Sequence, residues 1–403
     1  MKYIIVVMAG AADHPAEDLM GKTPLEVAKM PNLHYLTKVG RLGSAKLVTE
    51  HLPPGADTTL LNILGYNADA VYTGLGPIEA ANLELRLEDN EIPFRMNFIT
   101  EAQGVLADPT AGKLGTKEAR ALINFLNKKV ANDFIRFFPG SEYRHIAVLK
   151  DAHGFEALSA KTVDPDLAMN QSIESNLPKG PGEELLKKMM YDAKLLLQDH
   201  EINEVRVDLG ENPANMVWLW GQGQRPVLEK FKTMSGLSGA LISGIEYAKG
   251  IARLAGLTVV EVPGGTGDLE TNYEKKGKAI SDALAEKDFV CVHVRACDEA
   301  SRQGDLKAKI AAIEAIDFHI ISVVRAYLER NNDAKVLITP GYAHPWKMHR
   351  LVRDSVPFVV AGKNVRADEV EKFSELAAKS SELKAIKSHE LLASFLAKEF
   401  VKA

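Results

Sequence analysis

The sequence predicts an α/β protein with a mixed, mostly parallel sheet, helices on both faces of that sheet, and a second α/β domain inserted into the chain. Continuous apolar runs of strand length alternate with helical segments near both ends of the chain, which is typical of strands buried on both faces. This alternation changes character between about residues 85 and 230. With 403 residues, the chain is long enough for two cores. We therefore predict one domain in two segments, residues 1–84 and 231–403, and an inserted domain at 85–230.

The first segment opens with a predicted strand at residues 2–7, KYIIVV. Thr23 and Glu26 have the spacing of a capping box, and Pro24 suits the first turn of a helix. The other elements predicted here are a helix capped by Asn32 and ended by Gly40, a strand near residues 43–49, a turn at 53–57 and a helix from Thr58 to about Gly65.

The last segment repeats the alternation of strand and helix. Its clearest helix carries one apolar stripe with helical spacing from Leu306 to Leu328. The strands predicted in this segment are GALISGI (239–245), LTVVEVP (257–263), DFVCVHV (288–294), KVLITPG (335–341) and VPFVVAG (356–362).

Composition narrows the possible functions. The net charge is −5 with both signs scattered, so no nucleic-acid footprint is expected. No apolar run approaches the ~20 residues that a membrane-spanning helix needs. The start of the chain fits a buried first strand better than a signal peptide. Cys291 and Cys297 form no disulfide framework, which fits a reducing cytoplasm, so we predict a cytoplasmic protein.

Two places in the sequence are suited to hold a metal or a nucleophile. The first strand runs into Met8–Asp13, and PPGADTT is a sharp turn that feeds a helix. Open α/β folds bind ligands at the carboxyl edge of the sheet, where both places belong. However, Ala9 and Ala56 stand where a metal ligand and a hydroxyl are expected.

Long stretches of the chain occur in the order found in one known family: GKTPLEVAKMPNLHYL, LLNILGYN, FRMNFIT, SEYRH, NPANMVWLWGQG, KGIARLAGL, VEVPGGTGDLETNYE and DSVPF. In these stretches the chain resembles the archaeal-type cofactor-independent phosphoglycerate mutases of the alkaline phosphatase superfamily. The resemblance implies an alkaline-phosphatase-like domain in two pieces with a transferase-like domain inserted. It also implies a reaction in which two divalent metals, Mn, Zn or Mg, activate a serine that moves a phosphoryl group from 3-phosphoglycerate to the 2-hydroxyl of glycerate.

The resemblance also shows which of the family's functional residues are missing. Six of the seven metal and nucleophile positions are replaced, and only the aspartate at Asp298 remains. Hard divalent metals need several oxygen or nitrogen ligands each, so we expect no cofactor. The nucleophile position is Ala56, and the replaced metal positions are Ala9, Arg302, Gly341, Tyr342 and Leu351.

The positions that contact substrate in the family are retained: Asp57, Arg144, His145, Lys249 and Arg253. Arginine and lysine there suit phosphate or carboxylate. Each retained residue also has a structural interpretation. Asp298 would cap the following helix, His145 would be a core histidine, Asp57 a turn residue, and Lys249 with Arg253 a solvated helix face. The glycine-rich loop at 264–267 offers backbone N–H groups to an anion, but such a loop alone is weak evidence.

Two functions follow. In the first, the chain is a catalytically inactive homologue of the mutases that acts as a binding, regulatory or structural protein. Its ligand would be a phosphoglycerate-like small molecule, and a homo-oligomer or a protein partner is possible. In the second, the chain is an active mutase or related phosphotransferase with a relocated metal site. The residues available to that site are Thr58 or Thr59 as the hydroxyl, with Asp13, His293, Asp298, His344 and His349.

Overall fold

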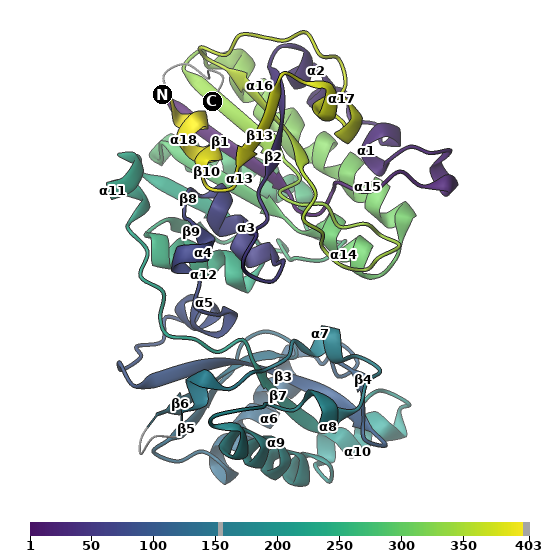
Figure 1. Cartoon of the computed structure of the whole chain (residues 1–403), viewed down its shortest axis with the longest axis vertical. Helices are drawn as coiled ribbons and strands as arrows, with labels where there is room; N and C mark the ends of the chain where they lie inside the picture. The colour runs from purple at the N-terminus through teal and green to yellow at the C-terminus, as the bar shows by residue number, and fades with distance from the viewer. Residues whose placement is uncertain (152–155, 398–403) are drawn as a thin grey trace. The chain divides into compact units, whose positions relative to one another are not determined.

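The computed structural model describes residues 1–151 and 156–397, without the side chains of residues 384–386. Contacts divide the chain into two compact units (Figure 1). Unit 1 comprises Met1–Tyr72 and Val227–Ala403, and unit 2 comprises Thr73–Pro226. The domain boundaries derived from the sequence, at 84/85 and 230/231, stay a prediction.

Unit 1 is built on an eight-stranded sheet in the order β13-β2-β12-β11-β1-β10-β8-β9. Only β12 runs antiparallel to its neighbours, so the predicted mostly parallel sheet is confirmed. The central strand β1 pairs Val7 with His293 on one side and with Thr339 on the other, so three strands end at the same edge. The strands are β1 (Lys2–Met8), β2 (Arg41–Lys46), β8 (Gly239–Ile242), β9 (Thr258–Val260), β10 (Phe289–Val294), β11 (Ala334–Thr339), β12 (Val356–Gly362) and β13 (Leu383–Lys387).

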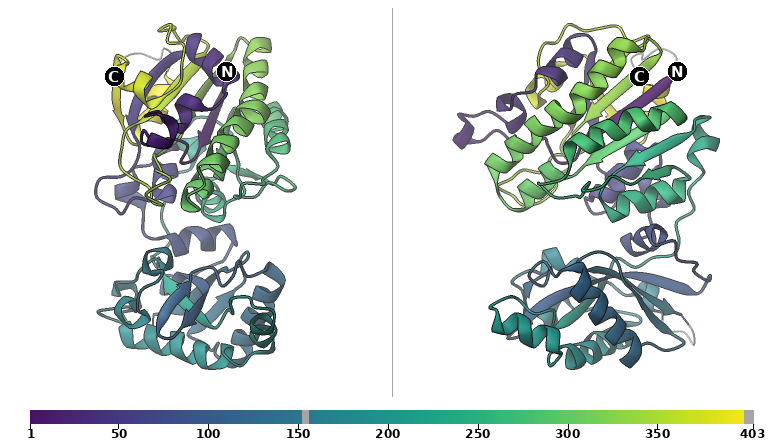
Figure 2. Two further views of the ribbon diagram at one scale, coloured as in Figure 1. Left: turned by 90° about the vertical axis from the view of Figure 1, so that its right-hand side faces the viewer. Right: turned by 180° about the vertical axis from the view of Figure 1, so that it is seen from behind.

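Helices cover both faces of this sheet, as predicted (Figure 2). Side chains alternate between the two faces along a strand. Tyr3 of β1 packs edge-on against Phe395 of α18 on one face, and α13, α15 and α16 cover the other. The helices of unit 1 are η1 (Glu17–Leu19), α1 (Pro24–Val27), α2 (Pro31–Lys38), α3 (Ala56–Ile63), α4 (Ala68–Val71), α11 (Phe231–Ser235), α12 (Glu246–Ala255), α13 (Tyr273–Glu286), α14 (Ala296–Arg302), α15 (Leu306–Ile316), η3 (Asp317–Ile321), α16 (Ser322–Arg330), α17 (Glu375–Ser380) and α18 (Glu390–Leu396).

Of the helix caps and helix boundaries predicted from the sequence, some agree with the structure and others do not. The capping box is confirmed, because the Thr23 side chain accepts from the Glu26 N–H and the Glu26 carboxylate accepts from the Thr23 N–H. The prediction that Asn32 caps the next helix is wrong: α2 begins at Pro31, and the Asn32 amide donates to the Asp317 carboxylate instead. The long apolar-striped helix is interrupted by η3, a π-helical turn. Asp317 begins this turn and accepts from the Leu33 N–H at 2.8 Å, a distant contact that the stripe does not reveal.

Unit 2 contains an antiparallel sheet in the order β4-β3-β6-β5, with β7 paired to β3. Buried aromatic side chains such as Phe94, Phe98 and Trp218 fill its apolar core. This is a second α/β arrangement, as predicted. Its strands are β3 (Glu91–Ala102), β4 (Val105–Asp108), β5 (Ile135–Phe138), β6 (Arg144–Lys150) and β7 (Met216–Trp220), and its helices are α5 (Leu75–Asn82), α6 (Thr116–Lys129), η2 (Ala157–Ser159), α7 (Pro165–Ala168), α8 (Ile173–Asn176), α9 (Glu183–Leu197) and α10 (Glu201–Asp208).

Candidate functional site at the carboxyl edge of the large sheet

The residues that follow β1, β10 and β11 meet around the carboxylate of Asp298. This aspartate lies in the first turn of α14 and is buried. One of its oxygens, Oδ1, is 2.6 Å from Nδ1 of His344 and accepts a hydrogen bond from the Tyr342 hydroxyl at 3.0 Å. Both partners come from the loop after β11. Asp298, Tyr342 and His344 therefore form a connected polar centre at the carboxyl edge of the sheet.

Two arginines neutralise the other oxygen of Asp298. Arg302 Nε donates to Oδ2 at 3.1 Å, and Arg295 Nε lies 3.4 Å from the same atom. Burial alone would raise the pKa of Asp298. Arg302, the hydrogen bond and charge of His344, and Arg295 outweigh burial and hold the pKa of Asp298 well below its usual range. The interpretation of Asp298 as a helix cap is wrong: the N-cap residue of α14 is Arg295, this helix has no side-chain cap among the described residues, and the Asp298 carboxylate bonds side chains of the centre instead.

The loop after β1 packs directly against this centre. Ala9 is buried, and Gly10 adopts φ +74°. A Cβ on Gly10 would lie 3.0 Å from the Cα of Asp298. A residue without a side chain is therefore required here both by the backbone conformation and by the space.

A second ion pair lies beside the first. Lys309 of α15 is fully buried and donates to Asp13 Oδ2 at 2.5 Å and to the His344 carbonyl at 2.8 Å. Glu375 accepts from the Asp13 N–H at 2.9 Å, and burial raises the pKa of this glutamate. The network joins the loops after β1 and β11 to α15 and α17. Lys309 was not among the predicted site residues, although a lysine beside the apolar stripe of an amphipathic helix is a signal for a buried charge.

The nucleophile position lies at the start of α3. Ala56 is the first residue of this helix, and Gly55 is its N-cap residue. The hydroxyls of Thr58 and Thr59 both donate to the Gly55 carbonyl, at 3.0 and 2.7 Å. Asp57 accepts from the Thr58 N–H at 2.9 Å and from the Tyr72 hydroxyl at 2.7 Å. Both threonine hydroxyl protons are therefore committed to the backbone.

The structure does not bring the proposed relocated metal ligands into one cluster. His344 contacts Asp298, whereas His349 Nδ1 lies 3.1 Å from the Arg302 carbonyl. His293 lies 3.2 Å from the Ser243 hydroxyl through Nδ1, and burial, followed by the charge of Lys276, lowers its pKa to about 3. Asp13 pairs with Lys309.

The other positions that the resemblance assigned to metal ligands hold residues suited to other roles. Gly341 has φ +74°, a conformation that residues with side chains rarely adopt. Tyr342 is buried against Asp298, and Leu351 is half-buried in the loop before β12. Within residues 1–151 and 156–397, no group of three or more His, Cys, Asp and Glu side chains could hold a metal ion.

The retained basic positions fall in both units. Lys249 and Arg253 lie one turn apart on α12, and Lys249 Nζ donates to Glu261 at 2.6 Å. In unit 2, Arg144 pairs with Glu142 at 2.6 Å. His145 is buried; burial lowers its pKa to about 3, and its Nδ1 accepts from the Gly140 N–H. Their joint role in binding stays a prediction.

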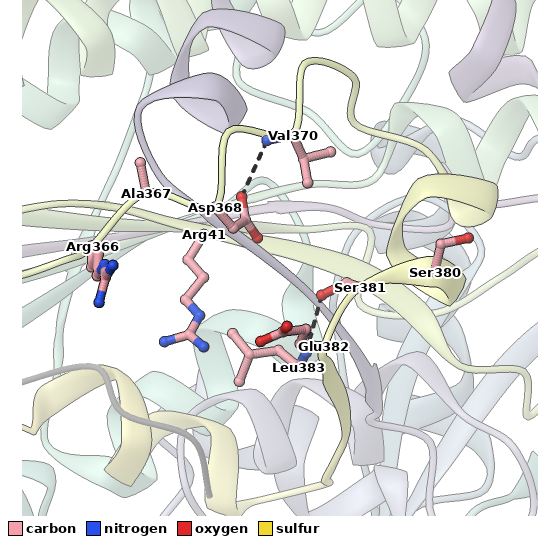
Figure 3. A pocket seen from close by; sticks show the side chains of 9 residues that line it. All are labelled: Arg41, Arg366, Ala367, Asp368, Val370, Ser380, Ser381, Glu382 and Leu383. Carbon is pink, nitrogen blue, oxygen red and sulfur yellow. Dashed lines mark hydrogen bonds between the residues drawn. The ribbon is translucent and has the colours of Figure 1, made fainter.

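A surface cavity of about 500 Å³ lies elsewhere on unit 1 (Figure 3). Arg41 begins β2 and Leu383 begins β13, and both strands run parallel to β1. The cavity is therefore at the amino edge, opposite the Asp298 centre. Its lining residues are Arg41, Arg366, Ala367, Asp368, Val370, Ser380, Ser381, Glu382 and Leu383.

Comparison with known proteins identifies the family. A family model described as 2,3-bisphosphoglycerate-independent phosphoglycerate mutase matches residues 37–203. A protein of that name from Methanothrix thermoacetophila is 38% identical over 393 residues, which cover 97% of this chain and 98% of the relative. Another, from Methanosarcina mazei, is 36% identical over 394 residues, with coverage of 97% and 98%.

Two solved structures agree with this family assignment. A Pyrococcus horikoshii protein superposes with a TM-score of 0.80 at 27% identity, covering 98% of this chain and 96% of that one. A cofactor-independent phosphoglycerate mutase from Thermoplasma acidophilum gives 0.62 at 27% identity, with coverage of 98% and 99%. The chain is thus an α/β protein with the architecture of cofactor-independent phosphoglycerate mutases. It belongs to the 2,3-bisphosphoglycerate-independent phosphoglycerate mutase family, as the sequence resemblance predicted.

Family membership corrects one expectation. We expected no cofactor, and the comparisons contradict that expectation: the relatives that match along the chain are 2,3-bisphosphoglycerate-independent phosphoglycerate mutases, a family whose members typically use divalent metals. None of the described helices combines the length and hydrophobicity that crossing a lipid bilayer would require. The cytoplasmic location stays a prediction.

Proposed function

We propose that this chain keeps the mutase frame as a binding protein for a phosphoglycerate-like anion and does not transfer a phosphoryl group at the family's centre. The start of α3 carries this proposal. Phosphoryl transfer through a covalent intermediate needs an activated oxygen nucleophile, and Ala56 offers none. The hydroxyls nearest in sequence, those of Thr58 and Thr59, donate to the Gly55 carbonyl.

The arrangement around Asp298 supports the same proposal. In a buried setting, a carboxylate needs charge compensation from its surroundings. Arg302 and His344 already provide it through direct contacts, so the aspartate is committed to partners within the protein. A reacting group would have to displace these contacts before it could use the carboxylate.

The basic side chains support the binding part of the proposal. Lys249 has a buried stem with its ammonium paired to the largely exposed Glu261, a partner that an anionic ligand can replace. Arg253 lies one turn away on the same helix. Lysine and arginine in one turn suit a ligand that carries both a phosphate and a carboxylate.

A coupled mutase assay tests inactivity. The purified chain is given 3-phosphoglycerate with Mn²⁺, Zn²⁺ or Mg²⁺, and 2-phosphoglycerate formation is followed. The Methanothrix thermoacetophila relative, prepared identically, serves as the positive control. We expect no turnover above background with any metal. Turnover would overturn the proposal, and its loss in Thr58→Val would then identify the relocated nucleophile.

Isothermal titration with 3-phosphoglycerate tests binding. We expect Lys249→Met to weaken binding by about ten-fold or more, because a charge-assisted hydrogen bond contributes about 1.5–3 kcal/mol. Lys363→Met is the matched control, because Lys363 also makes a short ion pair, to Asp333, but at the start of β11. Absence of binding to the unaltered chain, or equal loss in both variants, would contradict the proposal. The protein partner and the oligomer considered from the sequence stay predictions.

A further inference from the structure

Lys276 of α13 is a buried ammonium with few partners. The residue is 1% exposed, and its Nζ donates to the Thr266 carbonyl at 2.7 Å. Among the described residues it makes no ion pair within 4.0 Å, although an ammonium has three donors. Lys309 is equally buried but has Asp13 and two carbonyls as partners. The charge of Lys276 is therefore much less compensated than that of the neighbouring buried lysine.

The bond from Lys276 holds the glycine-rich loop that follows β9. A Cβ on Gly244 would lie 2.2 Å from the Gly265 carbonyl oxygen, and one on Gly267 would lie 1.9 Å from Ile245 Cδ1. The loop thus packs directly on the segment after β8, with no room for side chains. The glycines allow this close approach at the carboxyl edge of the sheet.

Charged and titratable groups face Lys276 from three elements: Asp268 from the loop, Lys249 from α12 and His293 from β10. Burial lowers the pKa of Lys276 to about 8; Asp268 opposes this shift and Lys249 adds to it. His293 is neutral near pH 7, since its pKa is about 3. Lys276 and Lys249 are thus two positive charges close enough to repel each other, an arrangement that a bound anion would relieve.

We propose that Lys276 is a ligand-positioning residue, which holds the glycine-rich loop at Thr266 and adds positive charge beside Lys249 for a phosphate ester of a hydroxy acid. This rests on the proposed function, because it concerns the same anion site. Lys276 itself is buried. It acts on the ligand indirectly, through the position of the glycine-rich loop and through the electrostatic effect of its ammonium charge.

The test is titration of the full chain with 3-phosphoglycerate between pH 7 and pH 9, where the phosphate, with a second pKa of about 6, stays a dianion. If binding requires the Lys276 proton, a pKa of about 8 makes binding about ten-fold weaker at pH 9 than at pH 7. Lys276→Met should bind at pH 7 no more tightly than the unaltered chain does at pH 9, with no remaining dependence on pH.

Lys335→Met is the matched control, because Lys335 is also fully buried and donates to one carbonyl, that of Ala397, but it lies on β11 near the amino edge. It should keep both the affinity and the pH profile. A flat profile in the unaltered chain would overturn the role of Lys276, and this measurement needs no variant. Normal binding by Lys276→Met, or equal loss in Lys335→Met, would overturn it too. If the unaltered chain does not bind 3-phosphoglycerate at all, both the proposed function and the role of Lys276 are wrong.

Discussion

Replacing Asp298 by Asn tests whether the centre of unit 1 is held together by its own charges. The substitution keeps the size of the side chain and removes the negative charge that Arg302, Arg295 and His344 share. Breaking a buried ion pair by removing one partner costs about 3–5 kcal/mol, because the other charge stays uncompensated.

The two arginines differ in how much they lose. The Arg302 side chain is 44% exposed, so its charge can reach water, and Arg295 keeps its ion pair with Glu299. We therefore expect the lower end of the range, about 3 kcal/mol. For a unit of this size that corresponds to a melting temperature lower by roughly 6–12 °C in calorimetry.

The pH dependence of this loss gives a sharper test. The folded-state pKa of Asp298 lies well below 3.8, so its stabilising contribution is complete above the unfolded-state pKa and disappears as the pH falls through the folded-state value. The stability difference between the unaltered chain and Asp298→Asn should therefore be largest near neutral pH and shrink below about pH 4. A difference that is constant with pH, or below about 1 kcal/mol, would refute a charge-held centre.

Asp317→Asn is the control with the opposite sign. Asp317 is also buried, but it is held by Asn32 and backbone N–H groups, and burial raises its pKa. The unaltered chain therefore loses stability as the pH rises through the folded-state pKa of Asp317. Its stability relative to Asp317→Asn should grow as the solution is acidified, whereas its stability relative to the Asp298 variant shrinks.

Three further predictions follow from local structure. Gly10→Ala should lower the free energy of unfolding by about 1–3 kcal/mol in denaturant titration, and more than Gly21→Ala, because Gly21 has a similar φ of +76° but open space around it. Cys291 and Cys297 are buried, and burial raises both thiol pKa values to about 12, so neither should react with a thiol reagent at pH 8 until the protein is unfolded. Ala56→Ser alone should show no mutase turnover with added metals, and any turnover would mean that the centre is still competent.

The strands could be predicted from the sequence because they are buried on both faces. VPFVVAG matches β12 residue for residue, and DFVCVHV matches β10 to within one residue. Burial on both faces leaves a continuous apolar run, which is a local signal. The π turn at Asp317 could not be predicted, since it depends on contacts with Asn32 and Leu33 far away in the chain.

The location of the site could be predicted from the sequence, but most of its hydrogen bonds and ion pairs could not. The family resemblance assigned metal positions to both Asp298 and Tyr342, and the structure connects these two residues with a hydrogen bond. Arg302 was predicted only as a replaced histidine. Its ion pair with Asp298, four residues earlier, follows from helical spacing and could have been predicted from the sequence. Lys276 and Lys309 were missed because their partners lie on other elements.

The residues around Asp298 compensate one another in charge. An isolated buried carboxylate is costly. Asp298 instead contacts Arg302 and the Tyr342 hydroxyl, two positions that the sequence resemblance assigned to metal ligands. The buried carboxylate is thus stabilised by side chains of the protein itself. If the proposed function is right, these side chains stabilise the fold around the anion site, and the Asp298→Asn variant should lose stability without any change in turnover.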